Sequence, residues 1–464
     1  MFLDIDRHKK DNPAVKDNEG YFLTYGELVK EVLQICGLKL ERSVVFCMCK
    51  NTVGALTGYM GLIEAGLVPV MLSAKSDMQL LKKLYDTYSP SYIWMPEDMS
   101  TSGQKCIYRS MGYSLIKTGN PVYPLHKELE LLMTTSGSTG SPRLVRYKTG
   151  NLKSNAQNVA EAFGWTENER PMCDLGMQYT MGLNVINTHL YVGAQLLLTT
   201  YNLMSGEFWD YIRNEGATSF TGVPFSYEIL SRLRFSEMEL PQLRTLCQGG
   251  GRLTDKRFEE YAEYAEKSGK RFVASFGTTE TAARLSVLPA EEAKKRIGSI
   301  GKAIPQGEMF LTDETGNILT DQEAEGELCY RGPNVTMGYA CCKNDLNYGD
   351  EWKEEYHTGD LARRDRDGFY YITGRKSRFL KLLSYRVSLD QCERIIQENT
   401  GAECACTGTD ERMLIYITDS DAREAVSECI SQKTGLFRSL FAVRVIDTIP
   451  RNDSGKIRYQ ELGI

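Results

Sequence analysis

Residues 134–141 read TTSGSTGS, eight consecutive positions that are each glycine, serine or threonine. The strand-like segment ELLM precedes this run, and RLVRYK follows it. Glycines let a backbone turn tightly and expose its N–H groups, and hydroxyls add donors, so such a loop suits a phosphate tail. The run lacks the Gly-Lys-Ser/Thr ending of a Walker A loop, and alone it would more often be a flexible surface loop. It therefore indicates a nucleotide site only together with other segments.

The first 300 residues alternate helical and strand-like patterns. TYGELVKEVLQICGL has apolar residues at helical spacing behind an N-cap at Thr24, with Glu27 three positions on, and the strand-like SVVFCMC follows at 43–49. Strands separated by helices of this length predict βαβ units in largely parallel sheets. Glycines end two later strand-like segments, at Gly249–Gly251 and Gly277, and ligands of such sheets bind beyond the carboxyl ends of the strands.

The pattern changes after about residue 301, where short strands and turns take over. Asp367-Gly368 lies between two strand-like stretches and predicts a hairpin. From Arg378 onward the segments RFLKLLSYRV, RMLIYIT and FAVRVID alternate with two helical stretches, which is typical of a small α/β unit. We therefore expect a large domain at 1–374, a small domain at 378–464 and a hinge near 375–377.

Composition excludes several functional classes. The chain has 464 residues, of which 42% are hydrophobic and 25% charged, with a formal net charge of -6, so no nucleic-acid partner is expected. No run reaches the length of a membrane span, and the N-terminal MFLDIDRHKKDNPAV lacks the apolar stretch of a secretion signal. We expect a cytoplasmic protein without membrane insertion, whose 13 cysteines are mostly buried, reduced thiols rather than zinc ligands.

Four further segments give the Gly/Ser/Thr loop its context: SFGTTE at 275–280, HTGD at 357–360, GRKSR at 374–378 and PRNDSGK at 450–456. In this order and at these separations, the five motifs resemble the adenylate-forming superfamily of acyl-CoA synthetases, peptide-synthetase adenylation domains and beetle luciferases. The resemblance spans nearly the whole chain. It implies an α/β fold in which a large N-terminal domain of doubly wound sheets plus a distorted β-barrel carries a small, mobile α/β C-terminal domain.

The resemblance also implies a role for each matched residue. Catalysis would involve Lys456, Glu280 and Thr135, with Glu280 holding Mg²⁺. ATP would be bound by Thr135, Ser136, Gly137, Ser138, Thr139, Gly140, Arg143, Gly249, Gly250, Gly251, Phe276, Gly277, Thr278, Thr279, Asp360 and Arg375. Arg143 stands where a lysine is usual, and Ser377 stands where the hinge usually has aspartate or lysine.

The chemistry of adenylation agrees with these residue types. A carboxylate must attack the α-phosphorus of ATP, so two anions approach each other, and Mg²⁺ and a mobile lysine can neutralise the charge that develops. An aspartate suits the ribose because its two oxygens accept from two hydroxyls. Each residue taken singly could equally have a surface or capping role, and the evidence lies in their joint order.

The acyl pocket is expected around Tyr179, Met181, Phe220, Val223, Pro224, Phe225 and Thr281. Amino-acid-activating relatives place an aspartate where Met181 aligns, and a buried ammonium without such a partner is costly, so a standard α-amino acid is disfavoured. A shift of the alignment would bring Asp174 into consideration. Any one of these residues could also be ordinary core.

The sequence therefore predicts an AMP-forming acid–thiol ligase that uses ATP and Mg²⁺. Its partners would be a small carboxylic acid and a thiol acceptor, either CoA or the phosphopantetheine of an acyl or peptidyl carrier protein. Ser384 replaces a glycine that many thioester-forming relatives carry where the pantetheine arm passes, which weakens the prediction of the thiol step. The alternatives are a non-catalytic ATP- or AMP-binding scaffold protein and a luciferase-like oxidative use of the adenylate.

Overall fold

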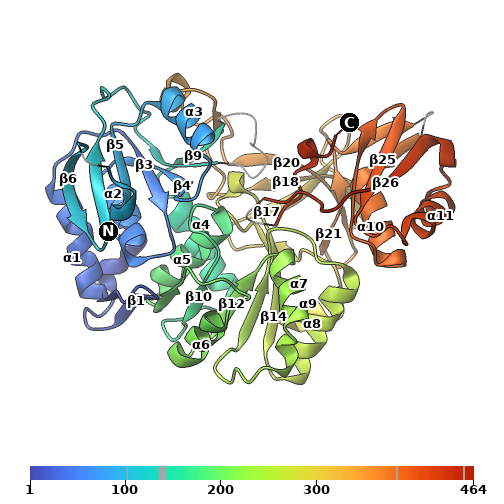
Figure 1. Ribbon diagram of the computed structural model, residues 1–464, viewed down its shortest axis with the longest axis horizontal. Helices are drawn as coiled ribbons and strands as arrows, with labels where there is room; N and C mark the ends of the chain where they lie inside the picture. Colours follow the sequence, from blue (N-terminus) through green and yellow to red (C-terminus); the bar gives the residue numbers. More distant parts are fainter. Residues whose placement is uncertain (102, 135–142, 383–384, 453–454, 464) are drawn as a thin grey trace.

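The computed structural model describes residues 1–101, 103–134, 143–382, 385–452 and 455–463. The predicted phosphate-loop residues Thr135–Gly140 and the departure at Ser384 lie outside them. Figure 1 shows two large sheets with their helices, a smaller antiparallel sheet and, at the C-terminal end, a separate small α/β part. This arrangement confirms the predicted α/β class.

The first large sheet has parallel pairing at its centre and antiparallel pairing at its edges. Helix α2 (Val53–Glu64) is buried along nearly all of its length, because glycines let it approach the sheet closely: a Cβ at Gly58 would lie 1.9 Å from the Trp94 Nε1. The predicted capping box of Thr24 and Glu27 is confirmed at the start of α1 (Tyr25–Gly37). In order, the strands are β19 (Tyr339–Ala340), β9 (Leu144–Lys148), β8 (Leu129–Thr134), β4 (Val68–Ser73), β3 (Val44–Cys49), β5 (Tyr92–Pro96), β7 (Tyr113–Lys117) and β6 (Lys105–Ser110), with α3 (Met78–Tyr88) beside them.

The second large sheet is mostly parallel, as the alternation of helices and strands predicts. In order, its strands are β16 (Lys302–Ala303), β15 (Ser286–Leu288), β14 (Arg271–Phe276), β13 (Thr245–Gln248), β12 (Ser219–Gly222), β10 (Pro171–Cys173), β11 (Leu196–Leu198), β1 (Pro13–Asp17) and β2 (Phe22–Thr24). Helix α4 (Asn151–Phe163) precedes β10, and the helices that follow strands of this sheet are α5 (Thr180–Val192), α6 (Gly206–Glu215), α7 (Pro224–Arg232), α8 (Asp255–Lys267) and α9 (Ala290–Ala293). Because β13 and β14 are parallel, their glycine-rich ends meet at one edge of the sheet.

One apolar core joins the two large sheets. It contains Leu131 of the first sheet and Leu196 of the second, together with Leu56 of α2 and Ile186 of α5, all essentially inaccessible to solvent. Helices α4 and α5 lie between the two sheets in Figure 1 and contact each other. Side chains that project from these two helices therefore lie deep in the molecule.

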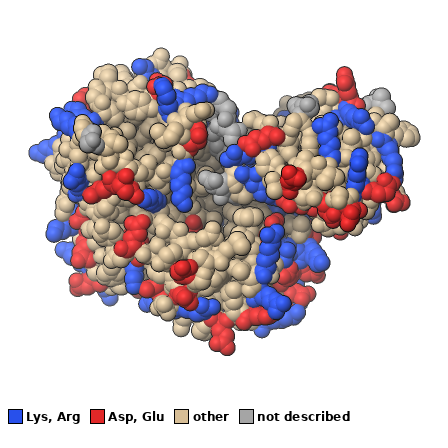
Figure 2. All heavy atoms as spheres, viewed as in Figure 1, with Lys and Arg blue, Asp and Glu red and all other residues tan. Residues whose placement is uncertain are grey.

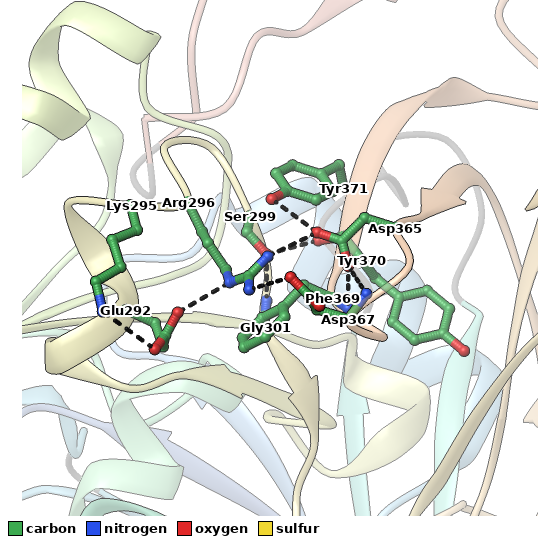
Figure 3. Close-up of polar contacts among 10 residues, drawn as sticks. All are labelled: Glu292, Lys295, Arg296, Ser299, Gly301, Asp365, Asp367, Phe369, Tyr370 and Tyr371. Atoms are coloured by element: carbon green, nitrogen blue, oxygen red, sulfur yellow. Dashed lines mark hydrogen bonds and ion pairs between the residues drawn. The ribbon is translucent and has the colours of Figure 1, made fainter. Parts of the chain in front are cut away.

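The antiparallel sheet of β17 (Glu308–Thr312), β18 (Ala324–Arg331), β20 (Glu355–Arg364) and β21 (Tyr370–Arg375) contains the predicted hairpin at Asp367-Gly368. Arg296, from the loop after α9, holds this hairpin against the second large sheet (Figure 3). Its guanidinium pairs with Asp365 at 2.9 Å and lies 3.8 Å from the ring centre of Phe369. These contacts fix one end of the β20–β21 pair; Asp360 lies midway along β20 and Arg375 is the last residue of β21.

The C-terminal part begins with β22 (Phe379–Leu382) and β23 (Tyr385–Ser388) and has its own core around Ile396, Ile415 and Ile430. It continues through α10 (Leu389–Thr400), β24 (Cys404–Thr409), β25 (Arg412–Ile417), α11 (Arg423–Thr434) and β26 (Phe441–Val445). Figure 2 shows a hollow where this part meets the rest of the chain, on a face where acidic and basic side chains are interspersed.

Short 3₁₀ helices complete the described elements: η1 (Phe2–Arg7), η2 (Glu97–Met99), η3 (Phe235–Glu237), η4 (Thr279–Thr281), η5 (Lys343–Asn347), η6 (Arg438–Leu440) and η7 (Tyr459–Glu461). Within the described ranges, none of the helices combines the length and the apolar composition needed to span a bilayer.

Candidate active site at the C-terminal cleft

The floor of the site is formed by the ends of β13 and β14. The segment Gly249–Gly251 leaves β13 in a tight conformation, with φ of +75° at Gly250. A Cβ at Gly249 would lie 2.4 Å from the Met181 Cε, so the predicted adenine segment and the predicted acyl-pocket residue are in direct contact. A side chain at Gly249 would collide with Met181, which gives a physical reason for the glycine.

Glu280 is presented by a loop that folds back on itself after β14. Ala282 and Ala283 have φ of 54° and 103°, and a Cβ at Gly277 would lie 1.4 Å from the Ala283 carbonyl oxygen. Only glycine fits at position 277 in this fold-back. Glu280 is 9% exposed at the first turn of η4.

Tyr339 orients the Glu280 carboxylate from the neighbouring sheet. The Tyr339 hydroxyl donates to the Glu280 Oε1 at 2.7 Å, and the Thr336 N–H donates to the Glu280 carbonyl at 3.0 Å. The Arg143 guanidinium lies 4.0 Å from the ring centre of Tyr339. A line of contacts thus joins the exit of the predicted phosphate loop to the predicted metal ligand.

Thr279, the residue before Glu280, is held from two directions. The Thr180 hydroxyl, at the start of α5, donates to the Thr279 hydroxyl at 3.1 Å. The buried Tyr147 hydroxyl donates to the Thr279 carbonyl at 2.7 Å. The loop that carries Glu280 is therefore fixed to α5, from which the acyl-pocket residue Met181 also projects.

Asp360 and Arg375 face each other across β20 and β21. The two residues are register partners, and the Arg375 Nε donates to the Asp360 Oδ1 at 3.1 Å. Asp360 is 5% exposed, and burial raises the pKa of its carboxyl to about 6 although Arg375 acts in the opposite direction. Arg375 itself is exposed, so the pair presents one buried acceptor and one accessible cation at the cleft.

Lys456 reaches the same place from the C-terminal part of the chain. Its turn is closed by the Asn452 N–H donating to the Lys456 carbonyl at 2.9 Å, and a Cβ at Gly455 would lie 2.7 Å from the Phe225 Cβ at the start of α7. Gly455 therefore allows the turn to dock on the large domain.

The electrostatic surroundings of Lys456 identify its neighbours. Its side chain is accessible from the cleft, yet the enclosing protein desolvates the ammonium group and lowers its pKa. Repulsion from Arg375 lowers the pKa further, while Glu280 and Asp360 act in the opposite direction. Two acids and two cations, predicted from four motifs distant in sequence, thus converge at one site.

This arrangement fits a nucleotide with a divalent cation. Within the described ranges, no three His, Cys, Asp or Glu side chains lie close enough together to form a metal cage. Mg²⁺ typically binds through one or two carboxylates together with phosphate oxygens and waters. The Glu280 carboxylate, oriented by Tyr339 and close to Lys456, suits a metal–polyphosphate complex.

The structure distributes the predicted pocket residues over different environments. Val223 and Pro224 lie against the segment Gly249–Gly251. A Cβ at Gly250 would be 3.0 Å from the Val223 Cγ1, and a Cβ at Gly251 would be 3.0 Å from the Pro224 Cγ. Phe225 is 40% exposed and meets the C-terminal turn. Tyr179 caps α5. Phe220 and Thr281 are buried, Phe220 in the core of the second sheet and Thr281 in a hydroxyl contact with Thr278.

Sequence reasoning missed two residues that the structure adds to this region. Tyr339 lies 59 positions from Glu280, on a two-residue strand whose short sequence carries no motif. Arg284 follows the fold-back and looks like ordinary strand sequence, but its guanidinium bonds to Ser275 beside the Gly249 wall. A charged residue inside an otherwise apolar stretch was the available signal for Arg284.

Comparisons with known proteins agree with this geometry. A family model described as AMP-binding enzyme matches residues 3–340. The oxalate–CoA ligase of Arabidopsis thaliana is 26% identical over 71% of this chain and 66% of its own length. The acetyl-coenzyme A synthetase of Penicillium chrysogenum is 24% identical over 98% of this chain and 79% of its own length. The chain thus matches just under two thirds of the first of these relatives.

A solved structure of a third protein shares the fold. The O-succinylbenzoate coenzyme A synthetase of Bacillus subtilis, in complex with AMP, superposes with a TM-score of 0.81 at 18% identity, covering 99% of this chain and 97% of that one. The same protein has been solved with ATP and a magnesium ion. At this identity the similarity establishes the shared fold of all the described parts.

Proposed function

Because the chain belongs to the family of AMP-binding enzymes, we propose that it is an ATP-dependent ligase. It activates a carboxylic acid as an acyl adenylate, releases pyrophosphate and then transfers the acyl group to a thiol. The observation that carries this proposal is the convergence of Lys456, from the C-terminal turn, with Glu280, Asp360 and Arg375. A binding-only protein has no mechanistic use for a lysine placed between two acids at a domain junction.

In the first step, a carboxylate oxygen attacks the α-phosphorus of ATP, and the bond to the bridging oxygen of pyrophosphate breaks. Lys456 donates hydrogen bonds to the oxygens on which negative charge develops, which lowers the barrier electrostatically. A Mg²⁺ ion held by Glu280 would supply further charge neutralisation at the phosphates. Tyr339 keeps the Glu280 carboxylate in place for that role.

The nucleotide would lie across the ends of β13 and β14. Phe276 and the segment Gly249–Gly251 would enclose the adenine, and Asp360 would accept from the ribose hydroxyls with Arg375 beside it. Arg143, at the exit of the Gly/Ser/Thr loop, would contribute positive charge near the phosphates.

In the second step, a thiol sulfur attacks the acyl carbon, the bond to the phosphate oxygen breaks, AMP leaves and the thiol proton passes to solvent. The related ligases named above are CoA enzymes, which favours CoA over a carrier-protein phosphopantetheine as acceptor. The exposed Ser377 lies between β21 and β22, and rotation there would withdraw Lys456 and admit the thiol.

The decisive experiment is carboxylate-dependent ATP–pyrophosphate exchange with Lys456→Ala. We expect the exchange rate to fall about 100-fold or more, with ATP binding retained, since one oriented donor to a developing charge contributes this much. Lys267→Ala removes a lysine that is 72% exposed on α8 and serves as the matched control. Exchange by Lys456→Ala at the wild-type rate contradicts the assigned role, and absence of exchange with every acid tested contradicts the proposed function.

A further inference from the structure

Arg284 is a fully buried cation without an acidic partner. Its side chain is 2% exposed, and across the described residues no carboxylate lies within ion-pair distance of it. Arg146, the other large arginine buried to this degree, pairs with Glu351. Burial lowers the pKa of the Arg284 guanidinium, and the nearby Cys247 acts in the opposite direction. A charge in this situation calls for a counter-ion.

The hydrogen bonds of Arg284 orient the guanidinium without neutralising it. The Nε donates to the Ser275 Oγ at 3.2 Å, and the Nη1 donates to the Asn184 Oδ1. Asn184 is itself held by a bond of 2.6 Å to the Asn155 Oδ1. The Phe163 ring centre lies 4.9 Å from the guanidinium. Amide, hydroxyl and ring supply partial charges only, so the full positive charge stays in the core.

The Arg284 guanidinium lies close to Gly249 and Met181, where the acyl group is expected. The Ser275 Oγ that it bonds would be 3.0 Å from a Cβ at Gly249, and the Met181 methyl group lies at the same spot.

A narrow crevice lies beside the amide partners of Arg284. Its lining includes Thr180, Ala282, Asn155 and Asn184. Thr180 bonds to Thr279 of the nucleotide motif at one end, and the two asparagines belong to the Arg284 network at the other. The crevice has no room for a water molecule in this conformation, so an entering acid must be slender and must displace adaptable side chains such as that of Met133, which lines it.

We propose, resting on the ligase function above, that Arg284 binds a second carboxylate of the substrate, which is a short dicarboxylic acid. One carboxylate of that acid is activated near Lys456, and the other supplies the missing counter-ion. A planar guanidinium is suited to bind a carboxylate through two hydrogen bonds. A monocarboxylic acid would leave the buried charge unpaired, and an ammonium group would be repelled by it.

The test compares matched acids in the ATP–pyrophosphate exchange assay with the full-length protein. Malonate, succinate and glutarate are paired with propionate, butyrate and valerate, which have the same chain lengths and one carboxylate fewer. We expect wild-type kcat/KM to favour one of the dicarboxylates over its partner by about 30-fold or more. Arg284→Met should lower kcat/KM for that dicarboxylate about 100-fold, because it removes one member of a buried charge pair, and should not lower it for the monocarboxylate.

Arg271→Met is the matched control. Arg271 donates to the carbonyl of Phe163, the residue whose ring Arg284 contacts, but it has an exposed side chain, so the wild-type preference should persist. Arg284→Gln is the second variant, should Arg284→Met fail to fold.

Several results would overturn the inference. If the wild-type protein prefers the monocarboxylate in all three pairs, the inference is overturned without any variant. It is also overturned if a folded Arg284 variant keeps the wild-type preference for the dicarboxylate. If no acid at all supports exchange, the ligase function itself fails, and this inference falls with it; exchange with monocarboxylates alone refutes only the dicarboxylate assignment.

Discussion

Replacing Tyr339 with phenylalanine tests whether Glu280 is held in place for catalysis. The change removes one hydroxyl and keeps the ring, which packs edge-on against Trp352 at 5.0 Å and carries Arg143 on its face. The lost interaction is a 2.7 Å hydrogen bond to a carboxylate that is 9% exposed. Hydrogen bonds to charged groups contribute about 1.5–3 kcal/mol, which corresponds to about 10- to 100-fold in rate.

The readout is the ATP–pyrophosphate exchange rate as a function of Mg²⁺ concentration. We expect Tyr339→Phe to lower the rate by that factor and to raise the Mg²⁺ concentration needed for half-maximal exchange, since an unoriented carboxylate binds the metal less well. A purely structural role would change the thermal midpoint without moving the Mg²⁺ dependence.

Tyr25→Phe is the matched control for this variant. The Tyr25 hydroxyl donates to the Ala194 carbonyl at 2.8 Å in the core, far along the chain from the site motifs. Its loss should reduce stability by about 1 kcal/mol and leave the Mg²⁺ dependence unchanged. A Tyr339→Phe enzyme with the wild-type rate and the wild-type Mg²⁺ response would refute the reasoning.

Three further predictions follow from the fold and the site. The pKa of Asp360 is raised to about 6, so its carboxylate becomes protonated as the pH falls through 6, and the KM for ATP should rise below that pH. Gly277→Ala should reduce the free energy of unfolding by about 3 kcal/mol or more in urea titrations, because its Cβ would lie 1.4 Å from the Ala283 oxygen. Arg296→Ala, which loses the contact with Phe369 and partly buried ion pairs, should cost about 1–3 kcal/mol of stability with little change in KM for ATP.

Each of these has a control with a distinct outcome. Asp360→Asn should weaken ATP binding at neutral pH and abolish the pH dependence of the KM for ATP near pH 6. If that pH dependence persists in the variant, another group is responsible for it. Gly206→Ala has no heavy atom near the new Cβ, so it should be close to neutral. Arg366→Ala removes an ion pair whose arginine is 77% exposed, so it should change the free energy of unfolding by less than about 0.5 kcal/mol. If Arg296→Ala lowers stability no more than Arg366→Ala does, the argument from the buried contacts of Arg296 is contradicted.

The Asp360 pKa also bears on stability, with a definite sign. The folded pKa is raised above the ordinary value of 3.8, so the folded state binds a proton more tightly than the unfolded state between about pH 4 and 6. The contribution of Asp360 to folding is therefore most favourable at low pH and is lost as the pH rises through this window. Nucleotide binding, which needs the carboxylate, improves in the same window, so ATP affinity and unliganded stability should move in opposite directions.

Local sequence signals predicted the elements well because their causes are local. The capping box at Thr24 and the hairpin at Asp367-Gly368 each depend on residues a few positions apart, and both are confirmed. The spacing of Cys47 and Cys49, two positions apart in β3, puts both side chains on one face of the strand, and their sulfurs lie 3.9 Å apart. Alternation of helices and strands was likewise sufficient to predict the mostly parallel second sheet.

Local sequence signals could not predict contacts between segments that are distant in the chain. The bond between Tyr339 and Glu280 depends on how β19 pairs with β9, and a two-residue strand has no periodicity to reveal it. Whether an acid lies near Arg284 depends on all of its surroundings, including α4 and α5, so no spacing in the sequence could show that none of the described carboxylates pairs with it. Motif order predicts which residues belong to the site, and packing determines what holds them in place.

The charge balance at the site explains why nucleotide binding and docking of the C-terminal turn should be coupled. With Lys456 in place, the surrounding charges of Arg375, Glu280 and Asp360 leave the lysine desolvated and only partly compensated. Phosphate groups add negative charge there and stabilise the docked turn, and by linkage the docked turn stabilises the bound nucleotide to the same extent. Once pyrophosphate has left, much of that negative charge is gone while the desolvation cost remains. Departure of the turn is then favoured at the stage at which a thiol must enter, so loss of pyrophosphate itself would set the order of the two steps.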